Sequence, residues 1–143
     1  MAYNTIKIKK YSDVIEEANA AAAITPGHLI EFTSAGKVQK HSSAGGTALT
    51  MFALEDELQG KGISEAYSAD NLVQCWVAGR GDMVYALVAA GATAITAGDF
   101  LESAGDGTLR KYASGVKIAQ AVESVDNSAS SISTEARIVV RIL

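Results

Sequence analysis

The chain has 143 residues, enough for one folded domain with its own core. It is 48% hydrophobic but only 6% aromatic, so the core must consist mainly of small and β-branched side chains, and the small area that these bury favours self-association. The net charge of −4 argues against binding to nucleic acid or to an anionic membrane, because such partners are held by clustered lysine and arginine. Neither a charged and apolar leader nor an apolar run of about 18 residues is present, so we expect no export and no membrane anchor.

The first 23 residues differ in pattern from the rest, and we expect them to form an N-terminal arm. Ile6 and Ile8 alternate with lysine, which predicts a short strand with one apolar face. Residues 12–13, Ser-Asp, could cap a helical turn that leads into the Ala-rich stretch 19–23. That stretch fits a linker and an arm lying on a neighbouring subunit equally well.

Glycine and serine separate short β-prone runs at nearly regular intervals from residue 24 onward. This pattern predicts an all-β fold, in which residues 24–143 form a single small antiparallel barrel or sandwich. The stretch 54–67 is interrupted by Gly60 and Gly62, so we expect a loop there with at most one helical turn. The expected strands are 28–33, 37–40, 50–55, 72–78, 83–89, 99–103, 108–112, 117–124 and 135–143.

Residues 24–43 are related to residues 95–114 by an internal duplication. At an offset of 71 the two segments share seven identities in twenty aligned positions, and both begin with I-T-x-G. The glycine of I-T-x-G permits a turn with positive φ, the apolar residues after it enter a strand, and Gly36 or Gly107 reverses the chain. The likeness continues from 53–55 to 121–123 if a gap of three residues is allowed. We therefore expect two related β units packed into one body.

The residues that could carry chemistry have simpler interpretations. Arg80-Gly81-Asp82 is similar to integrin-binding loops, but a four-residue hairpin loop explains it. The carboxylates at 55–57 lack the spacing of an EF-hand. The spacing of His28, His41 and Cys75 does not suit zinc, so we expect hydrogen-bonding histidines that are at the surface or partly buried, and a buried, unreactive thiol that indicates a reducing compartment.

The other polar groups give no better candidates. Asp99, Glu102 and Asp106 suit turn and surface positions. No G-x-S-x-G nucleophile element and no phosphate-binding loop occurs in the sequence. We therefore expect a protein that is not an enzyme, with no catalytic residue, no metal and no cofactor.

The second repeat resembles the capsid decoration proteins of tailed phages, which are also called cement or head-stabilising proteins. The likeness is carried by I-T-A-G-D-F-L-E-S-A-G-D-G-T-L-R-K-Y at 95–112, followed by I-A-Q-A-V-E at 118–123, and extends over roughly residues 24–143. The resemblance implies a structural virion protein that is made in the host cytoplasm and binds the major capsid protein on the outer surface of the assembled shell. It also implies a homotrimer.

On this interpretation the N-terminal segment is the candidate contact with the capsid or with a neighbouring subunit. An unpaired, alternating strand offers its edge to another sheet. The residues expected to make this contact are Ile6, Lys7, Ile8, Lys9 and Tyr11.

Two other functions remain open from the sequence. Small-residue strands also suit a fibre-tip or receptor-binding domain of a virion. The run Ile118-Ala119-Gln120 is similar to one in the trimeric dUTP pyrophosphatases, but the Gly-rich, Phe-containing C-terminal arm of those enzymes is missing, because this chain ends in a predicted strand.

Overall fold

The computed structural model of the chain describes residues 2–143 and is essentially all-β, which confirms the predicted fold class. Apart from one 3-10 turn, η1 (Glu57–Gln59), the described elements are strands. The strands are β1 (Lys7–Lys9), β2 (Val14–Asn19), β3 (Leu29–Phe32), β4 (Val38–Lys40), β5 (Met51–Ala53), β6 (Leu72–Val77), β7 (Met83–Val88), β8 (Phe100–Ser103), β9 (Leu109–Lys111), β10 (Ala119–Ala121) and β11 (Ala136–Ile142).

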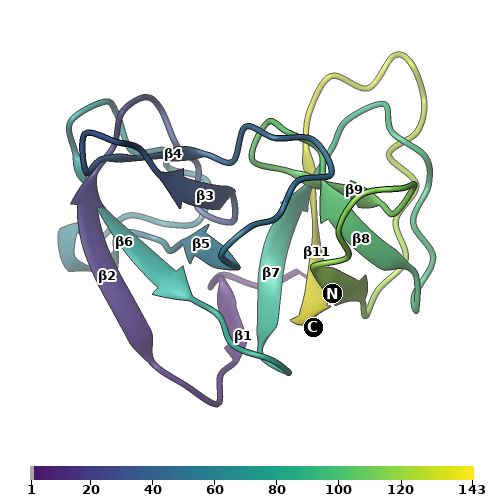
Figure 1. The fold of residues 1–143 in the computed structure, drawn as a ribbon, viewed down its shortest axis with the longest axis horizontal. Helices are drawn as coiled ribbons and strands as arrows, with labels where there is room; N and C mark the ends of the chain where they lie inside the picture. Colours follow the sequence, from purple (N-terminus) through teal and green to yellow (C-terminus); the bar gives the residue numbers. More distant parts are fainter. Residues whose placement is uncertain (1) are drawn as a thin grey trace.

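The strands form two sheets that each close on themselves. Strands β2 to β6 form a five-stranded sheet in the order β2-β6-β5-β3-β4, and a parallel bridge between Ala20 and Val38 joins β4 back to β2. Strands β7 to β11 follow in the order β7-β11-β10-β8-β9, and a parallel pairing of Val88 with Leu109 joins β9 back to β7. We call these rings the first barrel and the second barrel. They lie next to each other along the long axis of the molecule (Figure 1).

The two barrels have the same topology, so the duplication extends beyond the segments that the sequence relates. Gly27 and Gly98 have φ of 95° and 96°. The backbone N–H groups of Ala53 and Ala121 donate to the carbonyls of His28 and Asp99 at 3.1 and 2.9 Å. Ala53 and Ala121 are 68 residues apart, which is the offset of 71 less the gap of three residues. The fold is therefore two copies of one five-stranded unit.

The N-terminal segment differs from the expectation. Val14–Asn19 form β2, the counterpart of β7, so the predicted helical turn is wrong and only residues 2–13 precede the first barrel. A six-residue ladder with β6 stabilises this strand more than one cap could stabilise an isolated turn. The strand at Lys7–Lys9 is not unpaired either, because it forms an antiparallel pair with β7 of the same chain.

The core follows from the alternation of side chains along each strand. In the first barrel the inner residues are small or medium-sized, among them Ala18, Ile30, Val38, Met51, Ala53, Val73 and Cys75. Their outward neighbours Leu29, Phe52 and Trp76 belong instead to the cluster that fills the second barrel, and all three are fully buried. The outer face of the first barrel thus packs against the second barrel, and this contact unites the two.

Candidate contact surface

The N-terminal residues expected to contact a partner are divided by the fold into one buried residue and four accessible ones. Ile6 has no exposed surface, its N–H donates to Glu55 Oε2 at 3.1 Å, and its carbonyl accepts from the Tyr85 N–H at 2.9 Å. It fastens the segment to both barrels, so the prediction that Ile6 contacts a partner is wrong. Ile6 lies directly before β1, and because β1 pairs with β7, Ile6 enters the hydrophobic cluster of the second barrel.

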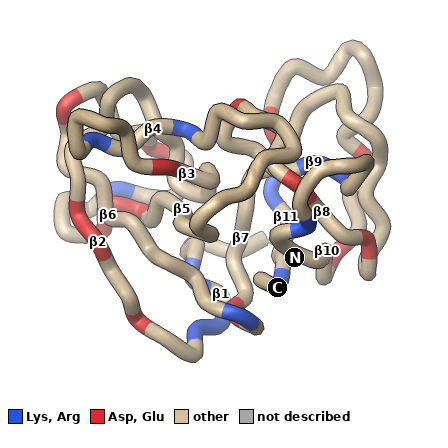
Figure 2. Tube along the Cα trace, viewed as in Figure 1, with Lys and Arg blue, Asp and Glu red and all other residues tan. Residues whose placement is uncertain are grey.

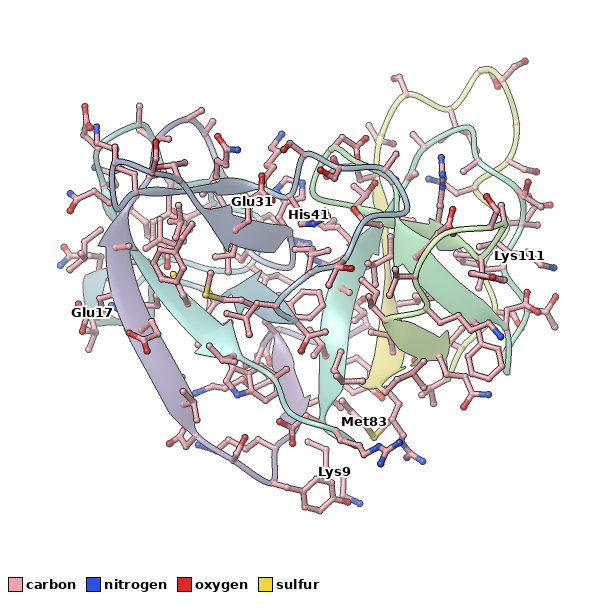
Figure 3. The ribbon with its side chains drawn as sticks, in the orientation of Figure 1. Lys9, Glu17, Glu31, His41, Met83 and Lys111 are labelled. Atoms are coloured by element: carbon pink, nitrogen blue, oxygen red, sulfur yellow. The ribbon has the colours of Figure 1, made fainter. Side chains whose placement is uncertain are left out.

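The accessible residues are Lys7, Ile8, Lys9 and Tyr11. Lys7 and Ile8 are half-buried, whereas Tyr11 keeps 69% of its surface exposed. The Lys9 ammonium lies 5.6 Å from the centre of the Tyr11 ring, a cation–π distance that holds a charge beside an exposed aromatic ring. Lys9 is the last residue of β1, and Figure 3 shows it beside the turn that leads to β2. A protruding aromatic and a cation on a short turn form a candidate protein contact.

Asp82 holds this turn in place by hydrogen bonds to its backbone. Its carboxylate is fully buried and accepts from the backbone N–H groups of Tyr11 at 2.6 Å and Gly79 at 2.7 Å. The carboxylate of Arg80-Gly81-Asp82 is therefore used internally and is not offered to a receptor. The loop is also not a hairpin, because β6 and β7, on either side of it, belong to different barrels.

The two histidines lie between the barrels and form hydrogen bonds as expected, but they are buried rather than exposed or partly buried. His28 Nδ1 accepts from the Thr25 N–H at 3.0 Å, and its Nε2 lies 3.0 Å from Glu135 Oε2. His41 Nδ1 lies 2.7 Å from Ser103 Oγ. Both rings are 2% exposed, because the second barrel covers the loops that carry them. They join the barrels to each other.

Glu102 was also expected at a turn or surface position, but it is fully buried. Its carboxylate accepts from Arg110 Nε at 2.9 Å and from the Gly115 N–H at 2.7 Å. Burial alone would raise the pKa of Glu102, but these hydrogen bonds outweigh burial and hold the pKa below its usual value. The duplication contained a signal for this role, since Glu31 accepts from Gln39 at the equivalent positions.

The acidic run at 55–57 does not form a metal site. Glu55 is nearly buried and accepts from the Thr5 hydroxyl at 2.5 Å as well as from the Ile6 N–H. Glu57 is exposed and begins η1. Across residues 2–143, no group of three His, Cys, Asp or Glu side chains could hold a metal ion. Figure 2 shows lysine and arginine spread among the acidic residues of both barrels.

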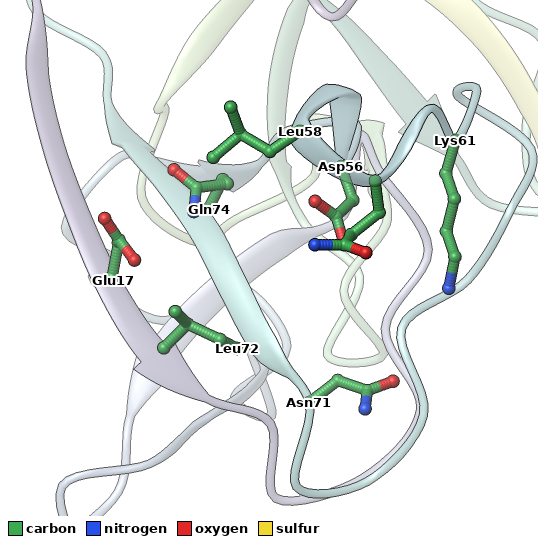
Figure 4. A pocket seen from close by; sticks show the side chains of 8 residues that line it. Glu17, Asp56, Leu58, Lys61, Asn71, Leu72 and Gln74 are labelled. Carbon is green, nitrogen blue, oxygen red and sulfur yellow. The ribbon is translucent and has the colours of Figure 1, made fainter.

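A groove of about 340 Å³ opens on the side of the first barrel that faces away from the second. Glu17 from β2, Leu72 and Gln74 from β6, and Asp56 and Leu58 from the η1 segment line it (Figure 4). Glu17 and Asp56 come from different walls, and no histidine or cysteine is among the lining residues. The groove offers polar and apolar contacts, and its charged side chains are Glu17, Asp56 and Lys61.

None of the helical turns in the described part of the chain is long and apolar enough to cross a membrane. In the comparisons with known proteins, no protein-family model and no curated sequence matches this chain.

Proposed function

We propose that this chain is a decoration protein that binds the outer surface of an assembled tailed-phage capsid and stabilises the shell. The observation that carries the proposal is the structure of the segment with the resemblance. Residues 95–112 form the turn and the β8–β9 hairpin, and 118–123 contain β10, so the likeness covers three neighbouring strands of the second barrel. The first barrel repeats this unit with β3, β4 and β5.

The proposed mechanism is binding by mass action. A protein that binds the assembled shell but not its separated subunits stabilises the shell by RT ln(1 + [L]/Kd) per site. The outer face of the first barrel packs into the hydrophobic cluster of the second, so the two barrels form one body that loses little conformational freedom on binding. Three copies related by symmetry, as in the homotrimer that the resemblance implies, would turn weak single contacts into strong avidity.

The proposed contact with the major capsid protein is the turn that carries Lys7, Ile8, Lys9 and Tyr11. Tyr11 supplies an exposed aromatic ring on a backbone that is fixed by Asp82, and Lys9 supplies the charge next to it. Rigid aromatic residues are common energetic centres of protein interfaces because they bury a large area at a small entropic cost.

The test is co-sedimentation with expanded shells assembled from the major capsid protein of the phage that encodes this chain. The intact protein should pellet with the shells and saturate, and Tyr11→Ala should weaken binding about tenfold. Leu49→Ala, at another exposed site, is the matched control and should bind normally. If the intact protein fails to bind expanded shells at micromolar concentration, the proposed function is wrong. Immunolabelling of virions confined to the tail tip would favour the fibre-tip alternative instead.

A further inference from the structure

The two barrels pack head to tail, because equivalent residues of the two units do not share the same environment. A Cβ added at Gly27 would lie 3.1 Å from the Tyr85 carbonyl oxygen, whereas one at the equivalent Gly98 would meet nothing within 4 Å. The reverse holds for the second pair of glycines. A Cβ at Gly107 would lie 2.9 Å from the Lys40 side chain, whereas one at Gly36 would be free. The first barrel thus contacts the second with the side that contains Gly27. The second barrel contacts the first with the side that contains Gly107.

The side of the second barrel that corresponds to the Gly27 side remains uncovered. We call it the forward face, and it contains Phe100, Val122 and Leu143. These residues are equivalent to Leu29, Leu54 and Ala78, as the shared backbone hydrogen bonds establish. The three residues of the first barrel are 0%, 6% and 2% exposed, whereas their counterparts on the forward face are 38%, 40% and 43% exposed.

The side of the first barrel that corresponds to the covered side of the second is also free. We call it the rear face, and it contains Glu17, Asn19, Phe32 and Leu72. Phe32 and Leu72 are 47% and 48% exposed. β2 is a terminal strand of its sheet, and among the described residues only the bridge at Ala20 lies on its outer edge. The rear face also contains the groove of about 340 Å³.

In the second barrel, the equivalent of the rear face is filled by the first barrel and the N-terminal segment. The ring of Tyr3 packs edge-on against Tyr85, with centroids 5.3 Å apart. The Leu87 N–H donates to the Gly27 carbonyl at 3.1 Å. The guanidinium of Arg137 donates to the Pro26 carbonyl at 2.7 Å. Tyr85, Leu87 and Arg137 take the places of Glu17, Asn19 and Leu72, as the registers of β7–β11 and β2–β6 establish.

The two free faces differ in their accessible charged residues: the forward face carries Arg141, whereas the rear face carries Glu17 and, in its groove, Asp56 and Lys61. Arg141, at the position of Trp76, is exposed on the forward face. Glu17, at the position of Tyr85, is exposed on the rear face. The Lys117 ammonium is a second positive charge on the forward face and lies 4.7 Å from the centre of the Phe100 ring. The rear face includes β2, at one end of the molecule, and the forward face includes the C-terminus next to β11 (Figure 1).

We propose that a second copy of this chain docks its rear face on the forward face of the first, repeating between molecules the contact that joins the barrels within one. The Gly98 carbonyl would accept from the Asn19 N–H of the next copy, as Gly27 does from Leu87. A contact between two different faces closes into a ring or grows into an open chain, according to its rotation. The proposal rests on the duplication and does not depend on capsid binding.

The test measures molar mass by light scattering and uses one variant for each face. The intact protein should be oligomeric at about 100 µM, and Val122→Glu on the forward face or Leu72→Glu on the rear face should each give a folded species with much weaker association. Leu49→Glu, at an exposed position that is not among the residues named for either face, should leave the oligomer intact.

Mixing the two monomeric variants distinguishes a head-to-tail contact from a symmetric one. Each variant keeps one intact face, so an equimolar mixture should form a one-to-one dimer and nothing larger. A mixture that stays monomeric would contradict the proposal, and so would an intact protein that is monomeric at 100 µM. Circular dichroism of each variant checks that the β fold is retained. Neither result bears on binding to shells, so this proposal and the proposed function can fail separately.

Discussion

The duplication provides a matched pair of substitutions, Gly27→Ala and Gly98→Ala. Both glycines have nearly the same positive φ, so an alanine at either position costs about 1 to 2 kcal/mol of backbone strain. At Gly27 the new Cβ also lies 3.1 Å from the carbonyl oxygen of Tyr85, a backbone atom that cannot rotate away. Overpacking of this kind costs about 1 to 3 kcal/mol more. Gly27→Ala should therefore lower the free energy of unfolding by about 2 kcal/mol more than Gly98→Ala does.

Equilibrium unfolding in urea measures this difference, with both substitutions made in a Val122→Glu background so that Gly98 stays uncovered. The slopes should agree, and the midpoint of Gly27→Ala should be lower. For a chain of this size the expected difference corresponds to about 6 °C in Tm. If the two variants lose equal stability within about 0.5 kcal/mol, the argument that Gly27 lies in a tight contact between the barrels is refuted.

Three further predictions concern buried polar groups. Glu102→Gln should cost about 1 to 2 kcal/mol near neutral pH. Because the folded pKa of Glu102 is lowered, this cost should shrink as the pH falls through that pKa, and urea titrations at several pH values should show it; a cost that is constant with pH would contradict the assignment. Tyr67→Phe should cost about 1 to 2 kcal/mol, because the Tyr67 hydroxyl donates to the Leu54 carbonyl at 2.7 Å in the core, whereas Tyr11→Phe, at an exposed ring, should be neutral. Burial raises the pKa of Cys75 to about 12, so a thiol reagent at neutral pH should label the folded protein only through unfolding, and the labelling rate should rise with urea.

The sequence predicted the features that depend on local backbone geometry. The two I-T-x-G segments require glycine at positive φ, and the hairpins that follow them were therefore predictable with their offset of 71. The strand Val14–Asn19 was not predictable, because two successive glutamates hide the alternation of polar and apolar residues. Its partner β6 also lies more than fifty residues away in the sequence. Closure of each barrel by a parallel pairing also depends on contacts between distant segments.

The candidate contact surface was predicted only in part, for a related reason. Lys9 and Tyr11 are accessible as expected, but Ile6 is not, because its burial arises where the two barrels meet. The same contact buries His28 and His41, whose sequence neighbours gave no sign of it. A single strand pattern reports which residues share a face, and it does not report what covers that face.

The core shared by the two barrels has a consequence for synthesis on the ribosome. The last strand of the first barrel, β6, ends at Val77, but the side chains of Leu29, Phe52 and Trp76 find their partners only in the second half of the chain. The nascent first half therefore emerges with an exposed hydrophobic surface. Its strand β1 is also unpaired, because its partner β7 has not yet been synthesised. Until translation is complete, this half is the part of the protein that needs a chaperone, and a prematurely terminated product should aggregate.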